Sequence, residues 1–393
     1  MRPVFTSLVL LASQIQPSLT YTLLSNHSLQ HLIPPPPVSA STSPDPDFDP
    51  VHSALLAPIL RSRVPGTPGH AAVQHHLTAF VRAYLHPSWQ VSWHNTTSTT
   101  PATGDRQVPF QNLVLRRDPP WVGTGPGAGA DGEVARLTLA AHYDSLYRPE
   151  GFVGAIDSAV PCALLLFAAR AVDEALTRRW ERMEGGGDGG GGLEEEKGVQ
   201  ILLLDGEEAW VEWSQADSLY GSRALAEAWE GTRYEAGSSF STPLEAISLF
   251  VLLDLLGAAE PNIPSYFPST HWAYQHVAVI EDRLRKLGVL ETKPRRPFLA
   301  EGDKEGVQFR GFVEDDHVPF MQRGVEILHI IPTPFPPVWH TMDDDGNHLD
   351  VPTIRDWARI MTAFVAEWMD LEGWLPEADP GRTESRYPEK DEL

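Results

Sequence analysis

The chain has 393 residues, of which 42% are hydrophobic, and its formal net charge is −23. This length allows one large core or two small ones, and we expect one large α/β domain. The charge argues against a nucleic-acid partner, because binding to phosphate groups needs basic patches. It excludes little else, since acidic surfaces are common among soluble proteins.

The two ends of the chain predict an address in the secretory pathway. Arg2 and the apolar stretch 4–12 are typical of a signal peptide, which we place at residues 1–24. The last four residues, 390–393, are Lys-Asp-Glu-Leu, a retention address of the endoplasmic reticulum. We therefore expect a protein of the endoplasmic-reticulum lumen that binds the KDEL receptor. No other segment is long and apolar enough to predict a transmembrane helix.

Two further features concern the same compartment. Sequons begin at Asn26 and Asn95, and each permits a glycoprotein without requiring it. Cys162 is the only cysteine, which excludes a disulfide within the chain. Stability must therefore come from the core, from a bound metal and from the size of the domain. We expect a monomer.

Proline- and glycine-rich segments mark the domain organisation. Residues 25–50 contain a proline-rich run that cannot continue a helix, and they predict an extended linker. The folded domain is expected over residues 51–375. Within it, the run GGGDGGGG at 185–192 predicts a flexible surface insertion between a helix and a strand. Residues 376–393 predict a polar tail.

Short apolar runs, separated by segments of helical periodicity, predict the fold. Continuous apolar runs are typical of strands buried on both faces of a parallel sheet. The alternation of strands and helices predicts a doubly wound α/β fold, with a mostly parallel central sheet flanked by helices in a single domain. The predicted strands are 137–141, 199–204, 249–253 and 325–331, and the predicted helices are 70–85, 159–177, 219–229, 271–287 and 352–370.

Acidic residues and histidines follow the predicted strands. His142 and Asp144 follow the first strand, and the pair Glu207-Glu208 follows the second. Ligand sites of such sheets lie beyond the carboxyl ends of the strands. A catalytic zinc takes three His or carboxylate ligands and keeps one position open. One glutamate of a neighbouring pair can bind the metal while the other acts as general acid and base. Any one of these residues alone would be interpreted as solvated surface, but their convergence indicates an enzyme.

Five stretches around these residues carry a family resemblance. In this order, over about residues 50–370, they resemble the glutaminyl-peptide cyclotransferases (glutaminyl cyclases), which share the fold of the M28 zinc aminopeptidases. The stretches are FVGAIDSAVPC (152–162), DGEEAW with WSQADSLYGSRALA (205–226), VLLDLLGA (251–258), EDDHVPF (314–320) and LHIIPTPFPPVWHTMDDD (328–345).

The resemblance implies an activity and a metal. It implies an acyltransferase that converts the N-terminal glutamine of peptides and proteins to pyroglutamate and releases ammonia. One zinc per chain would be bound by Asp157, Glu208 and His340.

The resemblance also implies roles for the residues around the zinc. Glu207 would move the proton between the reacting groups, and Asp254 and Asp315 would hold those groups through hydrogen bonds. Without the family motif, the tryptophans nearby would be interpreted as core residues. The residues implied to line the substrate pocket, or in the case of His329 to support Asp315, are Trp213, Val313, Phe335, Trp339 and His329.

The chain departs from the family pattern at three places. In members with a disulfide here, the cysteine matching Cys162 pairs with a position that is Ala141 in this chain, so we expect a buried free thiol. The segment 147–152 is shorter than in animal members, and Glu314 replaces a more usual glutamine. The last two differences bear on the entrance to the site and leave the ligand positions intact.

Two other functions are compatible with the pattern. A two-zinc aminopeptidase would use His142 and Asp254 as ligands of a second metal. The aromatic segment before His340 favours the cyclase over this alternative. A non-catalytic lumenal binding protein would keep the fold and lose the chemistry. The intact Glu207 and Asp315 argue against that second alternative.

Overall fold

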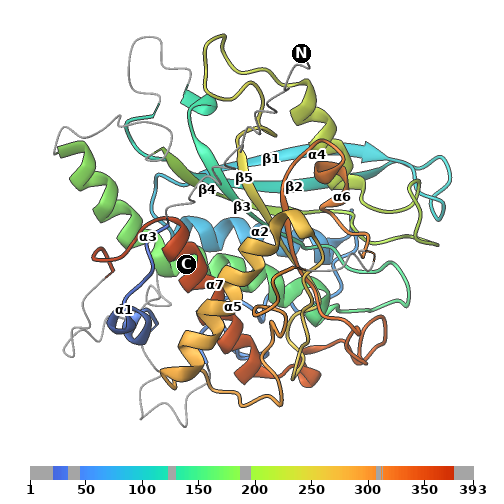
Figure 1. Ribbon diagram of the computed structural model, residues 1–393. Helices are drawn as coiled ribbons and strands as arrows, with labels where there is room; N and C mark the ends of the chain where they lie inside the picture. The colour runs from blue at the N-terminus through green and yellow to red at the C-terminus, as the bar shows by residue number, and fades with distance from the viewer. Residues whose placement is uncertain are drawn as a thin grey trace, which may run out of the picture.

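The computed structural model describes residues 21–33, 45–122, 130–185, 196–306, 311 and 313–375. Within these residues the strands form one six-stranded sheet with helices on both faces (Figure 1). The strands are β1 Gln90–Ser98, β2 Val108–Arg117, β3 Ala135–His142, β4 Lys197–Leu204, β5 Ile247–Leu253 and β6 Ile327–Ile330. The α-helices are α1 Asn26–His31, α2 Pro68–Tyr84, α3 Val160–Gly185, α4 Tyr220–Gly231, α5 His271–Lys286, α6 Val318–Met321 and α7 Val351–Trp368.

The sheet is mostly parallel, as the sequence predicts. Its strand order is β1-β2-β4-β3-β5-β6. The last four strands in this order are parallel, whereas β1 is antiparallel to β2 and β2 is antiparallel to β4. All four predicted strands are present, at the parallel positions. The doubly wound α/β prediction is therefore confirmed for this part of the sheet.

The β1–β2 hairpin was not predicted. Strand β1 is at the edge of the sheet, and its side chains alternate between exposed and half-buried along the sequence QVSWHNTTS. A strand with one solvated face has no continuous apolar run, so the criterion that identified the four parallel strands does not find it.

Two layers of helices cover the sheet (Figure 1). Residues of α2, α3, α5 and α7 share the largest hydrophobic cluster with one face of the sheet. Residues of α4 and α6 share a smaller cluster with the other face. The central strands β3 and β4 are buried almost throughout, because helices lie above and below them. This burial fixes the carboxyl ends of the strands, where the polar residues begin.

The segment predicted as an extended linker, 25–50, is partly helical where it is described. Helix α1 forms inside it, and the Ser25 side chain accepts a hydrogen bond from the Ser28 N–H to cap the helix. Leu29 and Phe48 are buried in the main core cluster. The proline content predicted an extended segment and gave no sign that Leu29 and Phe48 would be buried. Residues 34–44 lie outside the described part.

Several sequence predictions fall outside the described residues and stay predictions. These are residues 1–20 of the predicted signal peptide 1–24, the glycine-rich insertion and the tail 376–393 with its retention address. Residues 21–24 are described and pack on the domain, with Leu24 1% exposed, so these contacts fit a cleavage before Tyr21. Both sequon asparagines, Asn26 and Asn95, are exposed. Among the described helices, the stretch Ala155–Glu184 is long and apolar enough to cross a membrane, but 89% of its apolar window is buried inside the molecule.

A buried carboxylate ties the N-terminal segment to the rest of the domain. Glu367 of α7 is fully buried and accepts hydrogen bonds from the Leu24 N–H (3.0 Å) and from Arg283 Nη1 (2.8 Å). Its second oxygen lies 2.7 Å from His276 Nε2, and the ring of Tyr21 stacks on His276. Polar groups this deeply buried are stable only when they are paired.

Replacing Glu367 with Ala is therefore expected to lower the free energy of unfolding by about 3–5 kcal/mol, because Arg283 and His276 lose a buried partner. Urea denaturation measures this loss. The control is Asp282→Ala, which removes the exposed ion pair with Lys286 on α5 and is expected to cost less than about 1 kcal/mol. A similar small loss in both variants would contradict the role given to Glu367.

Candidate metal and active site

The three implied zinc ligands lie together at the carboxyl edge of the sheet. Asp157 is in the turn Ala155–Ala159 before α3, Glu208 follows β4, and His340 is in the loop after β6. Each offers one ligand atom, and these atoms lie within 4.8 Å of one another. His340 Nε2 is 3.4 Å from Asp157 Oδ2 and 3.7 Å from Glu208 Oε2.

The chemistry of this triad fits a divalent metal such as zinc. Asp157 Oδ2 and Glu208 Oε1 are buried without a hydrogen-bond partner among the described residues. A buried carboxylate oxygen without a donor is costly unless a cation compensates it. Two carboxylates and an imidazole are typical zinc ligands. His340 has φ +56°, a strained value for a residue other than glycine that is common at functional sites.

A second set of ligand atoms shares Asp157 with the first. His142 Nε2 lies 3.0 Å from Asp157 Oδ1 and 3.6 Å from Asp254 Oδ1. These three residues also offer atoms within 4.8 Å of one another. Burial alone would lower the pKa of His142, but hydrogen bonds to the surrounding carboxylates raise it well above its ordinary value. The geometry therefore keeps the two-metal alternative open.

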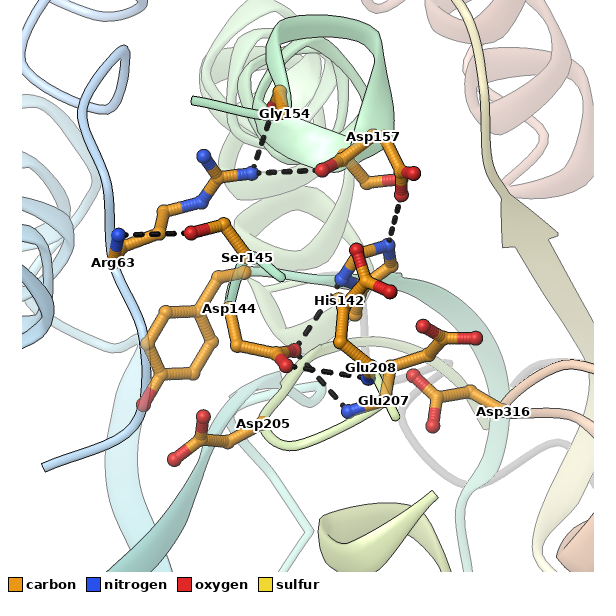
Figure 2. A network of polar contacts seen from close by, with 12 residues as sticks. Arg63, His142, Asp144, Ser145, Gly154, Asp157, Asp205, Glu207, Glu208 and Asp316 are labelled. Carbon is orange, nitrogen blue, oxygen red and sulfur yellow. Dashed lines mark hydrogen bonds and ion pairs between the residues drawn. The ribbon is translucent and has the colours of Figure 1, made fainter. Parts of the chain in front are cut away.

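Asp144 connects the two strands that carry the site (Figure 2). Its Oδ1 and Oδ2 accept the backbone N–H groups of Glu207 (3.2 Å) and Glu208 (3.3 Å). Asp144 Oδ1 also lies 3.3 Å from His142 Nδ1. Because β3 and β4 are neighbouring parallel strands, the residues after β3 orient the glutamate pair after β4. The sequence placed Asp144 only among the polar residues after the first predicted strand and did not reveal this positioning role.

Arg63 holds the turn that presents Asp157, and no sequence pattern predicted this role (Figure 2). Its fully buried guanidinium donates to the carbonyl oxygens of Gly154 (2.9 Å) and Asp157 (3.1 Å), and also to that of Val153. The same turn is also held by Asp344, whose Oδ1 accepts the Ile156 N–H at 2.8 Å. Arg63 lies before the first long helix and far in sequence from the end of any predicted strand. A search for polar residues that follow strands therefore does not find it.

The other predicted polar residues surround the triad. Glu207 is 6% exposed, and burial raises its pKa well above its ordinary value, with neighbouring carboxylates raising it further. Asp254 accepts hydrogen bonds from the Ser158 hydroxyl and from the Leu255 N–H. His329 Nε2 lies 2.8 Å from Asp315 Oδ2, which is the contact that the resemblance implied.

Aromatic and apolar side chains line the open side of the site. Trp213 and Trp339 are each 37% exposed, so they are not core residues. The Trp339 ring stacks on His340 with centroids 4.0 Å apart, and Phe335 contacts Trp339 with centroids at 4.7 Å. Val313 and Phe335 also pack against a small buried cluster that includes Ile331. Of the residues implied to line the pocket, Trp339 and Phe335 therefore lie beside His340, and their contact with a substrate stays a prediction.

Cys162 is the buried free thiol that the sequence predicts. Its Sγ donates a hydrogen bond to the His142 carbonyl oxygen at 3.1 Å. Burial raises the pKa of this thiol to about 12, so it stays protonated and unreactive. The described residues thus contain a thiol that contributes packing beneath the site.

This fold and this site define a metal-dependent enzyme of the zinc aminopeptidase type. The model of peptidase family M28 matches residues 125–365, and the chain belongs to that family. A leucine aminopeptidase precursor from Bacteroides thetaiotaomicron shares the fold, with a TM-score of 0.53 and 19% identity over 83% of this chain and 97% of that one.

Curated relatives place the chain more narrowly, among the glutaminyl-peptide cyclotransferases of that family. The glutaminyl-peptide cyclotransferase-like protein of Bos taurus is 40% identical over 81% of this chain and 75% of its own length. The glutaminyl-peptide cyclotransferase of Gloydius blomhoffii is 38% identical over 80% of each chain. The crystal structure of Macrostomum lignano glutaminyl cyclase matches with a TM-score of 0.64 and 29% identity, covering 88% of this chain and 95% of that one.

The contacts of Arg63 predict an effect on metal binding. Arg63→Met removes the hydrogen bonds that hold the Asp157 turn, and zinc affinity is expected to fall about 10–100-fold, as for other outer-shell residues. Arg63→Lys keeps the charge but not the planar fork, and an intermediate loss is expected. Competition with a chelator measures both. The matched control is Arg61→Met, two residues earlier and exposed; equal affinities in Arg63→Met and Arg61→Met proteins would contradict the role of Arg63.

Proposed function

We propose that this protein is a zinc-dependent glutaminyl-peptide cyclotransferase with one zinc per chain. Its substrates are peptides and proteins with an N-terminal glutamine, and its products are the pyroglutamyl peptide and ammonia. One observation carries the proposal: the triad Asp157, Glu208 and His340 is assembled beside a buried acid, Glu207, in a chain related to cyclotransferases over most of its length.

Zinc bound by the triad would supply Lewis-acid polarisation of the glutamine γ-amide. The residues of this chain have three tasks in the reaction. Trp339 and Phe335 contact the substrate side chain and exclude water from it. Asp254 and Asp315 accept hydrogen bonds from the amine and amide groups and hold the flexible glutamine folded. Holding both reacting groups in one geometry removes much of the entropic barrier.

Glu207 carries the one proton that must move from the attacking amine to the leaving nitrogen during cyclisation. The new bond joins the substrate α-nitrogen to the γ-carbonyl carbon, and the bond from that carbon to the amide nitrogen breaks. The Glu207 carboxylate accepts a proton from the attacking amine and gives it to the leaving nitrogen, which departs as ammonia. No water enters this balance. The buried position of Glu207 directly before the ligand Glu208 supports the assignment.

The nearest alternative is a two-zinc aminopeptidase. It is favoured by the second set of atoms on His142, Asp157 and Asp254 and by the fold shared with an aminopeptidase precursor. Against it stand the identity with cyclotransferase relatives and the aromatic side chains around His340. The two functions differ in their products and in the number of metals they need.

Incubation with a glutamine-initiated peptide separates the two functions. We expect the peptide to lose the mass of one ammonia, with no amino acid released, and we expect the loss to stop after zinc is removed with a chelator. Mass spectrometry follows the peptide, and elemental analysis of the purified protein is expected to give one zinc per chain. Release of intact N-terminal residues by a protein with two zincs would overturn the proposal.

Replacing Glu207 with Gln tests the proton transfer. The amide cannot accept the proton, so kcat is expected to fall about 10²–10⁴-fold while bound zinc is retained. Glu208→Gln is the matched neighbour, and it is expected to lose zinc as well as activity because it removes a ligand. Steady-state kinetics with metal analysis distinguishes the two. Cyclisation at the wild-type rate in the Glu207→Gln protein would exclude Glu207 as the acid and base.

A further inference from the structure

Two exposed side chains meet from loops that carry site residues, because Trp213 lies five residues after Glu208 and Glu314 directly precedes Asp315. Trp213 Nε1 donates a hydrogen bond to Glu314 Oε2 at 3.2 Å. The backbone before Trp213 is itself fixed, because the Asp217 carboxylate accepts the N–H groups of Val211 (2.8 Å) and Glu212 (3.0 Å). The indole orientation then depends on its single polar atom, which Glu314 binds.

The backbone of Glu314 is held on both sides. Val313 packs against the small buried cluster beneath the site. Asp315 is 1% exposed and lies 2.8 Å from His329 Nε2 through its Oδ2. Because both neighbours of Glu314 are held in place, the backbone from which its side chain extends is fixed. Glu314 therefore presents its charge at a defined place next to Asp315.

The burial of the site determines where a bound peptide leaves it. Asp157, Glu208 and Glu207 are 3%, 4% and 6% exposed, so the protein closes the inner side of the site. The side chain of His340 is 36% exposed, as open as Trp213 on the rim. With the N-terminal glutamine held against the triad, the residue after it must pass along this exposed side.

We propose that Glu314 is a specificity-determining residue with two separable effects, an inference that rests on the proposed cyclotransferase function. Through Oε2 it positions the Trp213 indole at the rim. Through its charge it favours peptides with a basic residue after the N-terminal glutamine and disfavours peptides with an acidic one. An attraction between two exposed charges changes kcat/KM by a small factor, about two- to fivefold, and salt screens this attraction.

Two substitutions separate the effects. Glu314→Gln keeps an oxygen that accepts the indole hydrogen bond and removes the charge. Glu314→Ala removes both. The substrates are three peptides that differ only in the second residue, Gln-Lys, Gln-Ala and Gln-Glu, and kcat and KM are measured for each in low salt and in high salt.

For the wild-type protein, kcat/KM is expected to be about two- to fivefold higher for the Gln-Lys than for the Gln-Glu peptide, and this ratio is expected to shrink in high salt. Both variants are expected to lower the ratio. Glu314→Ala alone is expected to raise KM for all three peptides, because Trp213 loses its hydrogen bond, while kcat stays closer to that of the wild type. The control Glu227→Gln removes a charge from the exposed face of α4 and is expected to leave the ratio as it is.

Peptide binding keeps this inference separate from the proposed chemistry. Calorimetry with the zinc-loaded Glu207→Gln protein measures the Lys-to-Glu preference without turnover, and the same preference is expected in binding. Equal affinities for the two peptides, or a preference that survives Glu314→Gln, would overturn the role of Glu314. A preference in binding without any cyclisation by the wild-type protein would instead overturn the proposed function.

Discussion

The carboxylate of Asp144 joins the carboxyl ends of two neighbouring strands, and the rest of the site depends on this junction. It binds the backbone of Glu207 and Glu208 and lies beside His142, so the ends of β3 and β4 cannot move independently. A hydrogen bond to a charged acceptor is stronger than a neutral one, and more so away from water. Glu207 and Glu208, the proposed acid and the proposed metal ligand after β4, are therefore oriented by a carboxylate that belongs to the neighbouring strand end.

The junction also concentrates negative charge in a place shielded from solvent. Around Asp144 lie several buried carboxylates, and the fully buried cation of Arg63 lies near them. Carboxylates buried close together destabilise one another unless cations compensate them. A metal ion at Asp157, Glu208 and His340 would relieve this repulsion as well as act on a substrate. Folding stability and metal binding are then coupled through the same residues.

Sequence patterns predicted the parts of the fold that obey one simple rule. The four predicted strands are continuous apolar runs because helices cover both of their faces. Glu207 and Glu208 were found because they follow β4, whereas Asp157 and His340 were implied by the family resemblance. Strand β1 escaped because one of its faces is solvated. Arg63 escaped for another reason: its partners are backbone carbonyls, which have no signature in the sequence. Asp157 belongs to two sets of possible metal ligands, one with Glu208 and His340 and one with His142 and Asp254. No local sequence pattern distinguishes between these two sets.

The hydrogen bonds of Glu367 limit how early the N-terminal segment can reach its native position during synthesis. The hydrogen bond from Leu24 to Glu367 spans 343 positions of the chain, and His276 and Arg283 join it from α5. Because synthesis proceeds from the N-terminus, the acceptor is made only after all six described strands. The first helix therefore cannot acquire this anchor on the ribosome until α7 emerges, and until then Leu29 lacks the α7 residues of the core cluster in which it is buried.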